Sequence, residues 1–289
     1  MKPTFKTVAL VGKYQSQEVA EPLLELGRFL EGRGIRVMLD ELTASQIEAG
    51  KYEALPLDEL GEAADLAIAI GGDGTMLNIA RAMAPHDVPL VGINQGRLGF
   101  LTDISTGTMI KTIDAMLEGQ YVTEGRMLLD GRVFRGGEKL FEALAFNDVV
   151  VSKGLKGGMI ELEFRIEGEF IHRQRSDGLI VATPTGSTAY ALSSGGPIVH
   201  PSLSVMAVVP VSPHTLSNRP IVIRGDSKVE IVVRHAADAR VHMDSHSAFD
   251  LREGDMVQVR RYPHPLNLLH PAGHSYYRML REKLNWNRD

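Results

Sequence analysis

Apolar residues in the first third of the chain occur in short runs, and the segments between these runs have the spacing of amphipathic helices. The apolar runs have the length of strands and cover residues 7–11, 35–39, 66–70 and 88–93. Residues 18–30 carry leucines spaced for one helix face, and residues 76–84 are expected to form another helix. Strands that alternate with helices predict an α/β domain with a doubly wound, Rossmann-like parallel sheet.

The pattern changes after about residue 120, where most apolar runs are short and are separated by turn residues. The clearest of them cover residues 145–151, 160–166, 178–181, 205–211, 228–233 and 256–260. Their spacing predicts a β-rich domain, either an antiparallel sandwich or a barrel-like fold, with a helix near residues 187–193. We therefore expect an α/β domain at 1–120, a β-rich domain at 121–265, and a carboxyl-terminal helix at 266–289 that packs on the first domain, its helical pattern running from 274 to 284.

The composition excludes several classes of protein. The 289 residues suffice for two ordinary domains, and a hydrophobic content of 44% supports a sizeable core. The net charge of −5 gives no general basic excess for a nucleic-acid backbone. The chain has no cysteine, which excludes disulfides, thiolate metal sites and a cysteine nucleophile. No apolar run reaches the roughly 18 residues of a membrane span and no signal peptide is visible, so we expect a cytoplasmic protein.

The residues Gly71-Gly72-Asp73-Gly74-Thr75 stand between an apolar run and a helical segment. Open parallel sheets bind ligands at the carboxyl ends of their strands. Glycines in such a turn are expected to adopt unusual φ angles and to let a ligand approach the backbone, while the following helix offers N–H groups to a phosphate. Asp73 is the one side chain here that could accept a proton from a substrate hydroxyl. The alternative is a tight turn in which Asp73 caps the helix.

A polar pair, Asn147-Asp148, interrupts the apolar run at 145–151. Buried polar groups need partners. Ribose hydroxyls would supply them, with Asp148 as an acceptor and Asn147 as both donor and acceptor. The alternative is a bulge or strand end, where the pair bonds to neighbouring backbone.

Two further polar segments are candidates. Within residues 174–190, Thr185 or Ser187 could cap a helix or bind a phosphate or an adenine edge, and Tyr190 could stack on a base or lie in the core. The polar loop at 213–220 contains His214, and a lone histidine is more commonly structural.

These elements, in this order, resemble the NAD kinase family, and the chain resembles bacterial members over nearly its whole length. The resemblance is carried by Gly-Gly-Asp-Gly-Thr at 71–75, Asn147-Asp148, Arg-Ser-Asp-Gly at 175–178, Thr-Pro-Thr-Gly-Ser-Thr-Ala-Tyr at 183–190, Gly-Gly-Pro at 195–197 and His-Thr-Leu-Ser-Asn-Arg-Pro at 214–220. The glycine turn is shared with diacylglycerol and sphingosine kinases. The segment at 183–190 together with Asn147-Asp148 is far more specific.

The resemblance implies an enzyme that transfers a phosphoryl group from ATP to the 2′-hydroxyl of the adenosine ribose of NAD, giving NADP and ADP. NAD would lie between an amino-terminal α/β domain and a carboxyl-terminal β-rich domain. Asp73 would be the catalytic base. Mg²⁺ would come with ATP, bound mainly to its phosphates. The family implies a homodimer or homotetramer, and neither nucleic acid nor a membrane is expected as a partner.

The resemblance also implies roles for individual residues in binding substrate or nucleotide. Asn147 and Asp148 would hold ribose hydroxyls, although many members have glutamate in place of Asp148, which changes the reach of the carboxylate. Arg175 could reach a phosphate or the nicotinamide half, and His246 could contact the site of a neighbouring subunit. The other expected contacts are Gly72, Gly74, Asn78, Gly158, Asp177, Thr185, Thr188, Ala189, Tyr190, Ser193 and His214.

Two other functions compete with this one, and a resident metal is not expected. A lipid kinase would share the glycine turn, but the chain has no obvious amphipathic docking segment and no basic cluster for anionic lipid. A non-catalytic dinucleotide sensor would not need the carboxylate of Asp73. The ten histidines show no His-Glu-x-x-His or other short-range ligand pattern, so we expect no metal site in the protein itself.

Overall fold

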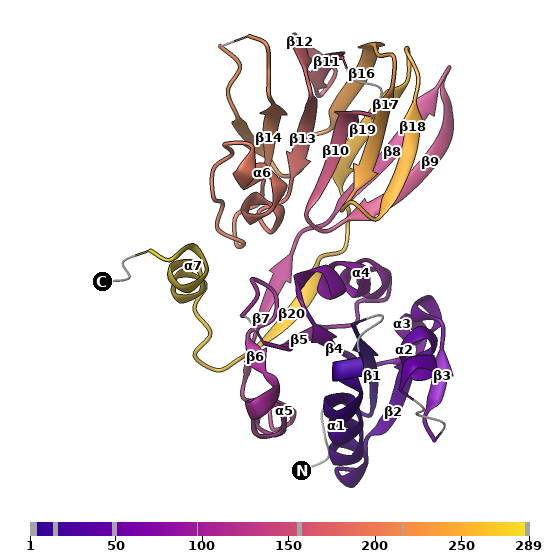
Figure 1. The fold of residues 1–289 in the computed structure, drawn as a ribbon, viewed down its shortest axis with the longest axis vertical. Coiled ribbons are helices and arrows are strands. Elements are labelled where there is room, and N and C mark those ends of the chain that lie inside the picture. Colours follow the sequence, from indigo (N-terminus) through magenta and orange to yellow (C-terminus); the bar gives the residue numbers. More distant parts are fainter. Residues whose placement is uncertain are drawn as a thin grey trace. The chain divides into compact units, whose positions relative to one another are not determined.

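The computed structural model describes residues 5–13, 17–47, 51–96, 98–154, 158–215 and 217–286. The chain divides into two compact units. Unit 1 comprises Met1–Gly125 and Leu266–Asp289, and unit 2 comprises Arg126–Pro265. Figure 1 shows unit 1 in indigo to magenta with the yellow carboxyl-terminal segment, and unit 2 in the intermediate colours.

Unit 1 is built on an eight-stranded sheet in the order β3-β2-β1-β4-β5-β20-β7, with β6 paired to β5. Its strands are β1 (Thr7–Gly12), β2 (Arg36–Asp40), β3 (Glu53–Leu55), β4 (Leu66–Gly71), β5 (Leu90–Asn94), β6 (Ile104–Ser105), β7 (Tyr121–Arg126) and β20 (Leu266–Pro271). The pairs from β3 through β5 to β20 are parallel. The expected doubly wound parallel sheet is therefore confirmed.

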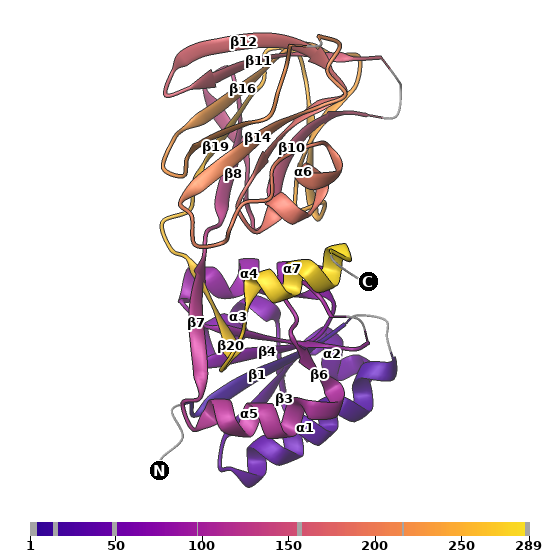
Figure 2. The ribbon, with the colours of Figure 1, turned by 90° about the vertical axis from the view of Figure 1, so that its left-hand side faces the viewer.

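Helices cover both faces of this sheet. They are α1 (Ala20–Gly32), α2 (Glu41–Gln46), α3 (Leu57–Ala63), α4 (Asp73–Met83), α5 (Met109–Leu117) and α7 (Tyr276–Leu284), with short 3₁₀ turns η1 (Gln17–Val19), η2 (Ala84–His86) and η3 (Thr106–Thr108). Figure 2 shows α1 and α5 side by side on one face, with α3 and α4 on the other. The buried leucines of α1 pack on the apolar side chains of β1 and β2 in one core cluster.

The carboxyl-terminal segment differs from the expectation of a helix over 266–289. Its first residues form strand β20, which continues the sheet beyond β5, and the helix begins at Tyr276. Ser275 caps this helix by accepting a hydrogen bond from the amide of Arg278. Lys283 of α7 donates a hydrogen bond to the carbonyl of Leu98, and the helix is part of unit 1.

Unit 2 is a sandwich of two six-stranded sheets whose strand pairs are antiparallel. One sheet has the order β15-β14-β13-β10-β17-β18 and the other β12-β11-β16-β19-β8-β9. The strands are β8 (Leu129–Arg135), β9 (Glu138–Ala145), β10 (Asp148–Lys153), β11 (Ile160–Ile166), β12 (Glu169–Ser176), β13 (Gly178–Ala182), β14 (Val205–Val211), β15 (Ile221–Arg224), β16 (Val229–His235), β17 (Ala239–Met243), β18 (Ser247–Leu251) and β19 (Met256–Arg261). Side chains from both sheets form one apolar core.

The helix expected near residues 187–193 is divided. A 3₁₀ turn, η4 (Gly186–Thr188), is followed by a single helical turn, α6 (Tyr190–Ser193). No helix in the described ranges is both long and apolar enough to cross a membrane.

Candidate active site

The glycine turn lies at the point in unit 1 where the strand order reverses. The chain proceeds from β1 through β2 to β3 on one side and from β4 to β5 on the other. The carboxyl ends of β1 and β4 therefore meet at the topological switch point, where open α/β sheets bind their ligands. Strand β4 ends at Gly71, and α4 begins two residues later at Asp73.

Glycine is used in this turn because it lets other atoms approach the backbone closely, and not because φ is unusual. Gly72 is extended, with φ −107° and ψ −176°, and neither Gly71 nor Gly74 has a positive φ. The expectation of unusual φ angles is therefore wrong. A Cβ at Gly71 would lie 2.5 Å from the Thr75 hydroxyl, whereas a Cβ on Gly72 or Gly74 would meet nothing within 4 Å. Glycine at 72 and 74 leaves the backbone open at the amino end of α4.

The Asp73 carboxylate is held by the chain that follows β5. Its two oxygens accept hydrogen bonds from the amides of Phe100 at 2.9 Å and Leu101 at 3.0 Å. The cap position of α4 belongs to Gly72, and no side chain caps this helix end, so the capping alternative for Asp73 is wrong. Each carboxylate oxygen retains lone pairs, and the half-buried side chain can still accept a proton or a hydrogen bond.

The loop that holds Asp73 is itself fitted closely around it. A Cβ at Gly99 would lie 2.1 Å from Asp73 Oδ1 and 2.4 Å from the hydroxyl of Thr102. The amide of Gly99 donates to the carbonyl of Thr102, which closes the loop on itself. This loop was not predicted from the sequence. The one available signal was Gly99, which directly precedes the apolar pair Phe100-Leu101.

Asn78 lies four residues after Gly74 on α4, and therefore on the same face of that helix. It is half-buried, and its side-chain oxygen accepts a hydrogen bond from Arg81.

In unit 2, the Asn147-Asp148 pair lies where the chain crosses from one sheet to the other. Strand β9 ends at Ala145 and β10 begins at Asp148, so the apolar run at 145–151 is two strands and not one. The carboxylate of Asp244 accepts hydrogen bonds from the amides of Phe146 at 2.7 Å, Asn147 at 2.7 Å and Asp148 at 3.1 Å. Asp244 follows β17 with a φ of 52° and was not identified from the sequence.

Asp148 is buried beside this anchor. Its side chain forms no hydrogen bond with any described residue, and the residue is 4% exposed. Burial, and after it the charge of Asp244, raises the pKa of Asp148 to about 7. A polar ligand that hydrogen-bonds to this buried carboxyl group would offset the free-energy cost of removing it from water.

The segment at 183–190 packs directly on the backbone of this pair. The Thr183 hydroxyl donates to the carbonyl of Phe146 at 2.7 Å, and its amide donates to the carbonyl of Asn147 at 2.9 Å. A Cβ at Gly186 would lie 2.1 Å from the Asn147 carbonyl oxygen, so glycine is required there by close approach. The Gly186 amide donates to the Thr183 hydroxyl.

Neither Thr185 nor Ser187 caps the helical turns as one alternative had suggested. The Ser187 hydroxyl is buried and bonds to the carbonyl of Pro184 and the amide of Val199, and Thr185 accepts a hydrogen bond from Arg126 at 3.2 Å.

The residues after Gly186 lead to the surface. The Thr188 hydroxyl bonds to the carbonyl of Thr185, and Ala189 is half-buried. Tyr190 is 46% exposed, which excludes the alternative of a core position and leaves its ring available for stacking. Ser193 is exposed as well. His246 is exposed in the turn after β17, two residues beyond Asp244.

A second group of expected residues lies at the opposite end of the same sheet. Asp148 pairs with Ala182 at one end of β13, whereas Asp177 precedes the first residue of that strand. A rise of about 3.3 Å per residue puts about 16 Å between the two ends. Asp177 forms an ion pair with Lys153 at 2.7 Å.

Arg175 and His214 lie at the same end of the sandwich as Asp177. Arg175 is exposed, and its carbonyl accepts a hydrogen bond from the amide of His214, which is exposed too. Gly158 has a φ of +85° and precedes β11. One copy of unit 2 thus does not bring Arg175, Asp177 and His214 to the Asn147-Asp148 end.

A cluster of titratable groups in unit 1 was also missed. Asp103, at the end of the loop after β5, accepts hydrogen bonds from His270 at 2.9 Å and His274 at 2.8 Å. Burial by itself raises the pKa of Asp103, but the hydrogen bonds and charges of the two histidines outweigh it and lower the pKa to about 2. The two histidines are four residues apart in the sequence, and this spacing alone does not identify a ligand pair.

Comparisons with known proteins indicate the same protein family for both units. A family model of the ATP-NAD kinase N-terminal domain matches residues 8–121, and one of the ATP-NAD kinase C-terminal domain matches residues 146–270. The NAD kinase of Nitrosospira multiformis is 60% identical over 287 residues, which are 99% of this chain and 98% of that protein. The NAD kinase of Thiobacillus denitrificans is 53% identical over 288 residues, covering 100% of this chain and 99% of its own.

Two solved structures share the fold. Yeast NADH kinase complexed with NADH superposes with a TM-score of 0.92 at 24% identity, over 99% of this chain and 89% of that one. An NAD kinase from Archaeoglobus fulgidus in complex with ATP superposes with a TM-score of 0.75 at 27% identity, over 96% of this chain and 98% of that one. The chain belongs to the NAD kinase family, and its activity is the phosphorylation of NAD to NADP.

Proposed function

We propose that Asp73 is the general base that accepts the proton of the adenosine-ribose 2′-hydroxyl as ATP phosphorylates it. The observation that supports this role is the carboxylate held by the amides of Phe100 and Leu101 at the switch point of the sheet. A ribose hydroxyl is a poor nucleophile at neutral pH, and a fixed carboxylate that takes its proton makes attack on the phosphorus easier. The two amide bonds fix the direction from which this carboxylate can act.

The open backbone at Gly72 and Gly74 is proposed to face phosphate oxygens, as helix amino termini do. Phosphoryl transfer otherwise depends on alignment and on neutralising charge. Mg²⁺, carried on the ATP phosphates, would supply part of that neutralisation.

Ribose binding is proposed for Asn147 and Asp148. The backbone of both is fixed by Asp244, which leaves their side chains to serve a ligand. The side chain of Asp148 has no hydrogen bond from the described residues, so a ribose hydroxyl would give its carboxyl group the partner that its burial calls for. Thr188, Ala189 and the exposed ring of Tyr190 would bind the rest of the dinucleotide.

We further propose a homo-oligomer in which a neighbouring copy supplies Arg175, Asp177 and His214. The separation of about 16 Å along β13 supports this, since one copy holds these residues away from its own Asp148. Analytical ultracentrifugation would give a dimer or tetramer. Mixing inactive Asp73→Asn with inactive Asp177→Ala protein should restore part of the activity, because some sites would then combine two intact halves. A monomer, or no restored activity in mixed oligomers, would contradict the sharing of sites.

The role of Asp73 is tested by making Asp73→Asn and measuring NADP formed from NAD, ATP and Mg²⁺ with an NADP-specific dehydrogenase. We expect turnover to fall about 10²–10⁴-fold, the usual contribution of a general base, while NAD binding measured by calorimetry changes little. The matched control is Asp65→Asn, at the other end of β4, because its carboxylate also accepts two backbone amides, those of Lys6 and Thr7. Wild-type turnover in Asp73→Asn would show that the base is a different group.

A further inference from the structure

The histidines of the missed cluster are stacked between two carboxylates of unit 1. The ring centroids of His270 and His274 are 3.8 Å apart with an angle of 18° between their planes. Both Nδ1 atoms point to Asp103 Oδ2, and the Nε2 atoms lie 3.8 Å and 4.0 Å from Glu124 Oε2. The side chains of the two histidines are 2% and 9% exposed.

The two imidazoles leave buried polar atoms without a hydrogen-bond partner among the described residues. Neutral imidazoles that donate from Nδ1 to Asp103 turn their Nε2 lone pairs toward Glu124, an acceptor facing an acceptor. Both Nε2 atoms are buried, and neither forms a hydrogen bond within the described residues.

We propose that Asp103, His270 and His274 form a binding site for a divalent transition-metal ion, Zn²⁺ by the nature of its ligands. One ligand atom from each of these three residues lies within 4.8 Å of the other two. In both histidines, Nδ1 is the nitrogen that faces Asp103. Nδ1 coordination leaves the imidazole protons on Nε2, which faces Glu124 Oε2 at 3.8 Å and 4.0 Å, just beyond hydrogen-bond distance. A histidine that binds a metal through one nitrogen almost always donates from the other to a carboxylate or carbonyl.

The distances require only a small adjustment. Metal–ligand bonds of about 2.0–2.1 Å in tetrahedral geometry separate the ligand atoms by about 3.3 Å. The present separations of 2.9 Å and 2.8 Å from Asp103 Oδ2 would therefore widen by about 0.5 Å. Two imidazoles favour Zn²⁺ over Mg²⁺ or Ca²⁺, which prefer oxygen ligands only.

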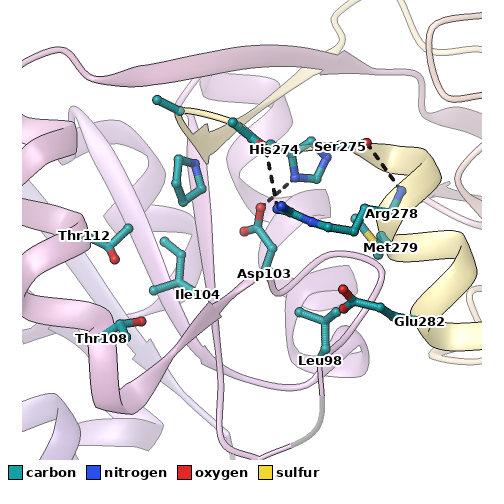
Figure 3. A pocket seen from close by; sticks show the side chains of 13 residues that line it. Leu98, Asp103, Ile104, Thr108, Thr112, His274, Ser275, Arg278, Met279 and Glu282 are labelled. Atoms are coloured by element: carbon teal, nitrogen blue, oxygen red, sulfur yellow. Dashed lines mark hydrogen bonds and ion pairs between the residues drawn. The ribbon is translucent and has the colours of Figure 1, made fainter.

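A pocket gives an ion access to this cluster. Asp103 and His274 line a cavity of about 420 Å³, together with Arg278, Glu282 and Thr108. Figure 3 shows these side chains. Water from this cavity can complete a tetrahedral site that has three protein ligands. The fourth position would thus open toward solvent, while Glu124 closes the other side of the rings.

The ion would join two segments that are distant in the sequence. Asp103 ends the loop whose amides at Phe100 and Leu101 hold Asp73, and the histidines flank the turn between β20 and α7. We therefore assign the ion a positioning role and no part in the chemistry. This link to catalysis rests on the proposed role of Asp73, but the binding site itself does not.

The test is metal binding by the full chain, produced without an affinity tag that contains histidine. Protein loaded with Zn²⁺ and then dialysed should retain one ion per chain by plasma mass spectrometry, and Co²⁺ should give the intense visible absorption of a tetrahedral site. His274→Gln and Asp103→Asn should lose the retained ion and this absorption. Glu124→Gln should weaken Zn²⁺ binding about 10–100-fold, as expected for an outer carboxylate.

The control is His235→Gln, at an exposed histidine whose side chain is 74% accessible, and it should bind as the wild type does. Circular dichroism would verify that each variant is folded. If the wild-type chain retains no zinc and gives no cobalt absorption, the proposal is overturned whatever the variants do. Equal binding by His274→Gln would overturn it too. Neither readout depends on NADP formation, so a failure here is distinct from a failure of the general-base assignment.

Discussion

Replacing Asp148 by asparagine should stabilise unit 2, and more so as the pH rises. The folded-state pKa of Asp148 is about 7, against an ordinary value of 3.8, because burial and Asp244 disfavour its charge. Below pH 4 the folded and unfolded chains both hold the proton. Between pH 4 and 7 the folded chain keeps it while the unfolded chain loses it, so the free energy of unfolding falls by about 1.4 kcal/mol per pH unit.

The difference between the two pKa values sets the size of the effect. It amounts to about 4 kcal/mol above pH 7, which is an upper limit because the surroundings can relax around the charge. Asparagine has nearly the same shape and never ionises, so the Asp148→Asn chain escapes this loss. We expect the variant to match the wild type near pH 4 and to exceed it by about 2–4 kcal/mol at pH 8.

Hydrogen exchange is the appropriate assay because it reports the opening of one unit at a time. The amides of β10 and β13, followed by mass spectrometry in the absence of NAD from pH 5 to 8, would give the opening free energy of unit 2. The control is Asp226→Asn, because the hydrogen bond from Arg224 lowers the pKa of this exposed carboxyl group, the opposite direction. An Asp148→Asn chain less stable than the wild type at pH 8, or a difference that does not change with pH, would refute the reasoning.

Two glycine substitutions test close contacts of the proposed site. Gly99→Ala would put a Cβ 2.1 Å from Asp73 Oδ1, and kcat should fall about 10²-fold through displacement of the base while the circular dichroism of the protein is unchanged. Gly186→Ala would put a Cβ 2.1 Å from the carbonyl oxygen of Asn147, and urea unfolding should show a loss of about 1–3 kcal/mol together with weaker NAD binding. The control for both is Gly107→Ala, where nothing lies within 4 Å. Normal kcat for the first variant, or normal NAD affinity for the second, would show that the contact is not needed.

The fold class could be predicted because its signals are local. Apolar runs and helical spacing identified the strands β1, β2, β4 and β5, and the same periodicity identified α1 and α4. Strands β20 and β7 were not assigned to the first sheet, since their place depends on pairing between the two distant parts of the chain that form unit 1. The apolar run at 145–151 was read as one strand because alternation does not reveal a crossing between sheets.

The site residues divide in the same way. Asp73 and the Asn147-Asp148 pair could be proposed from the sequence because polar residues within or beside apolar strands are visible there. Asp244 was missed because its three backbone partners are nearly a hundred residues away, and only the folded chain brings its carboxylate to them. A turn aspartate with such a role looks like any other turn residue in the sequence.

Asp73 and Asp244 show how backbone amides and carboxylates are matched in this chain. Each carboxylate accepts hydrogen bonds from the backbone amides of a loop. The two differ in how much acceptor capacity remains for a ligand. Asp244 takes three amides and thereby fixes the backbone of Asn147 and Asp148, so it acts through other residues. Asp73 takes two amides, one on each oxygen, and remains half-buried with lone pairs to spare. Substitution of Asp244 should therefore reduce stability and NAD affinity together, because three backbone amides, two of them buried, lose their acceptor. Substitution of Asp73 by asparagine keeps one acceptor oxygen for the two part-buried amides of its loop, so it should act mainly on turnover through loss of the base.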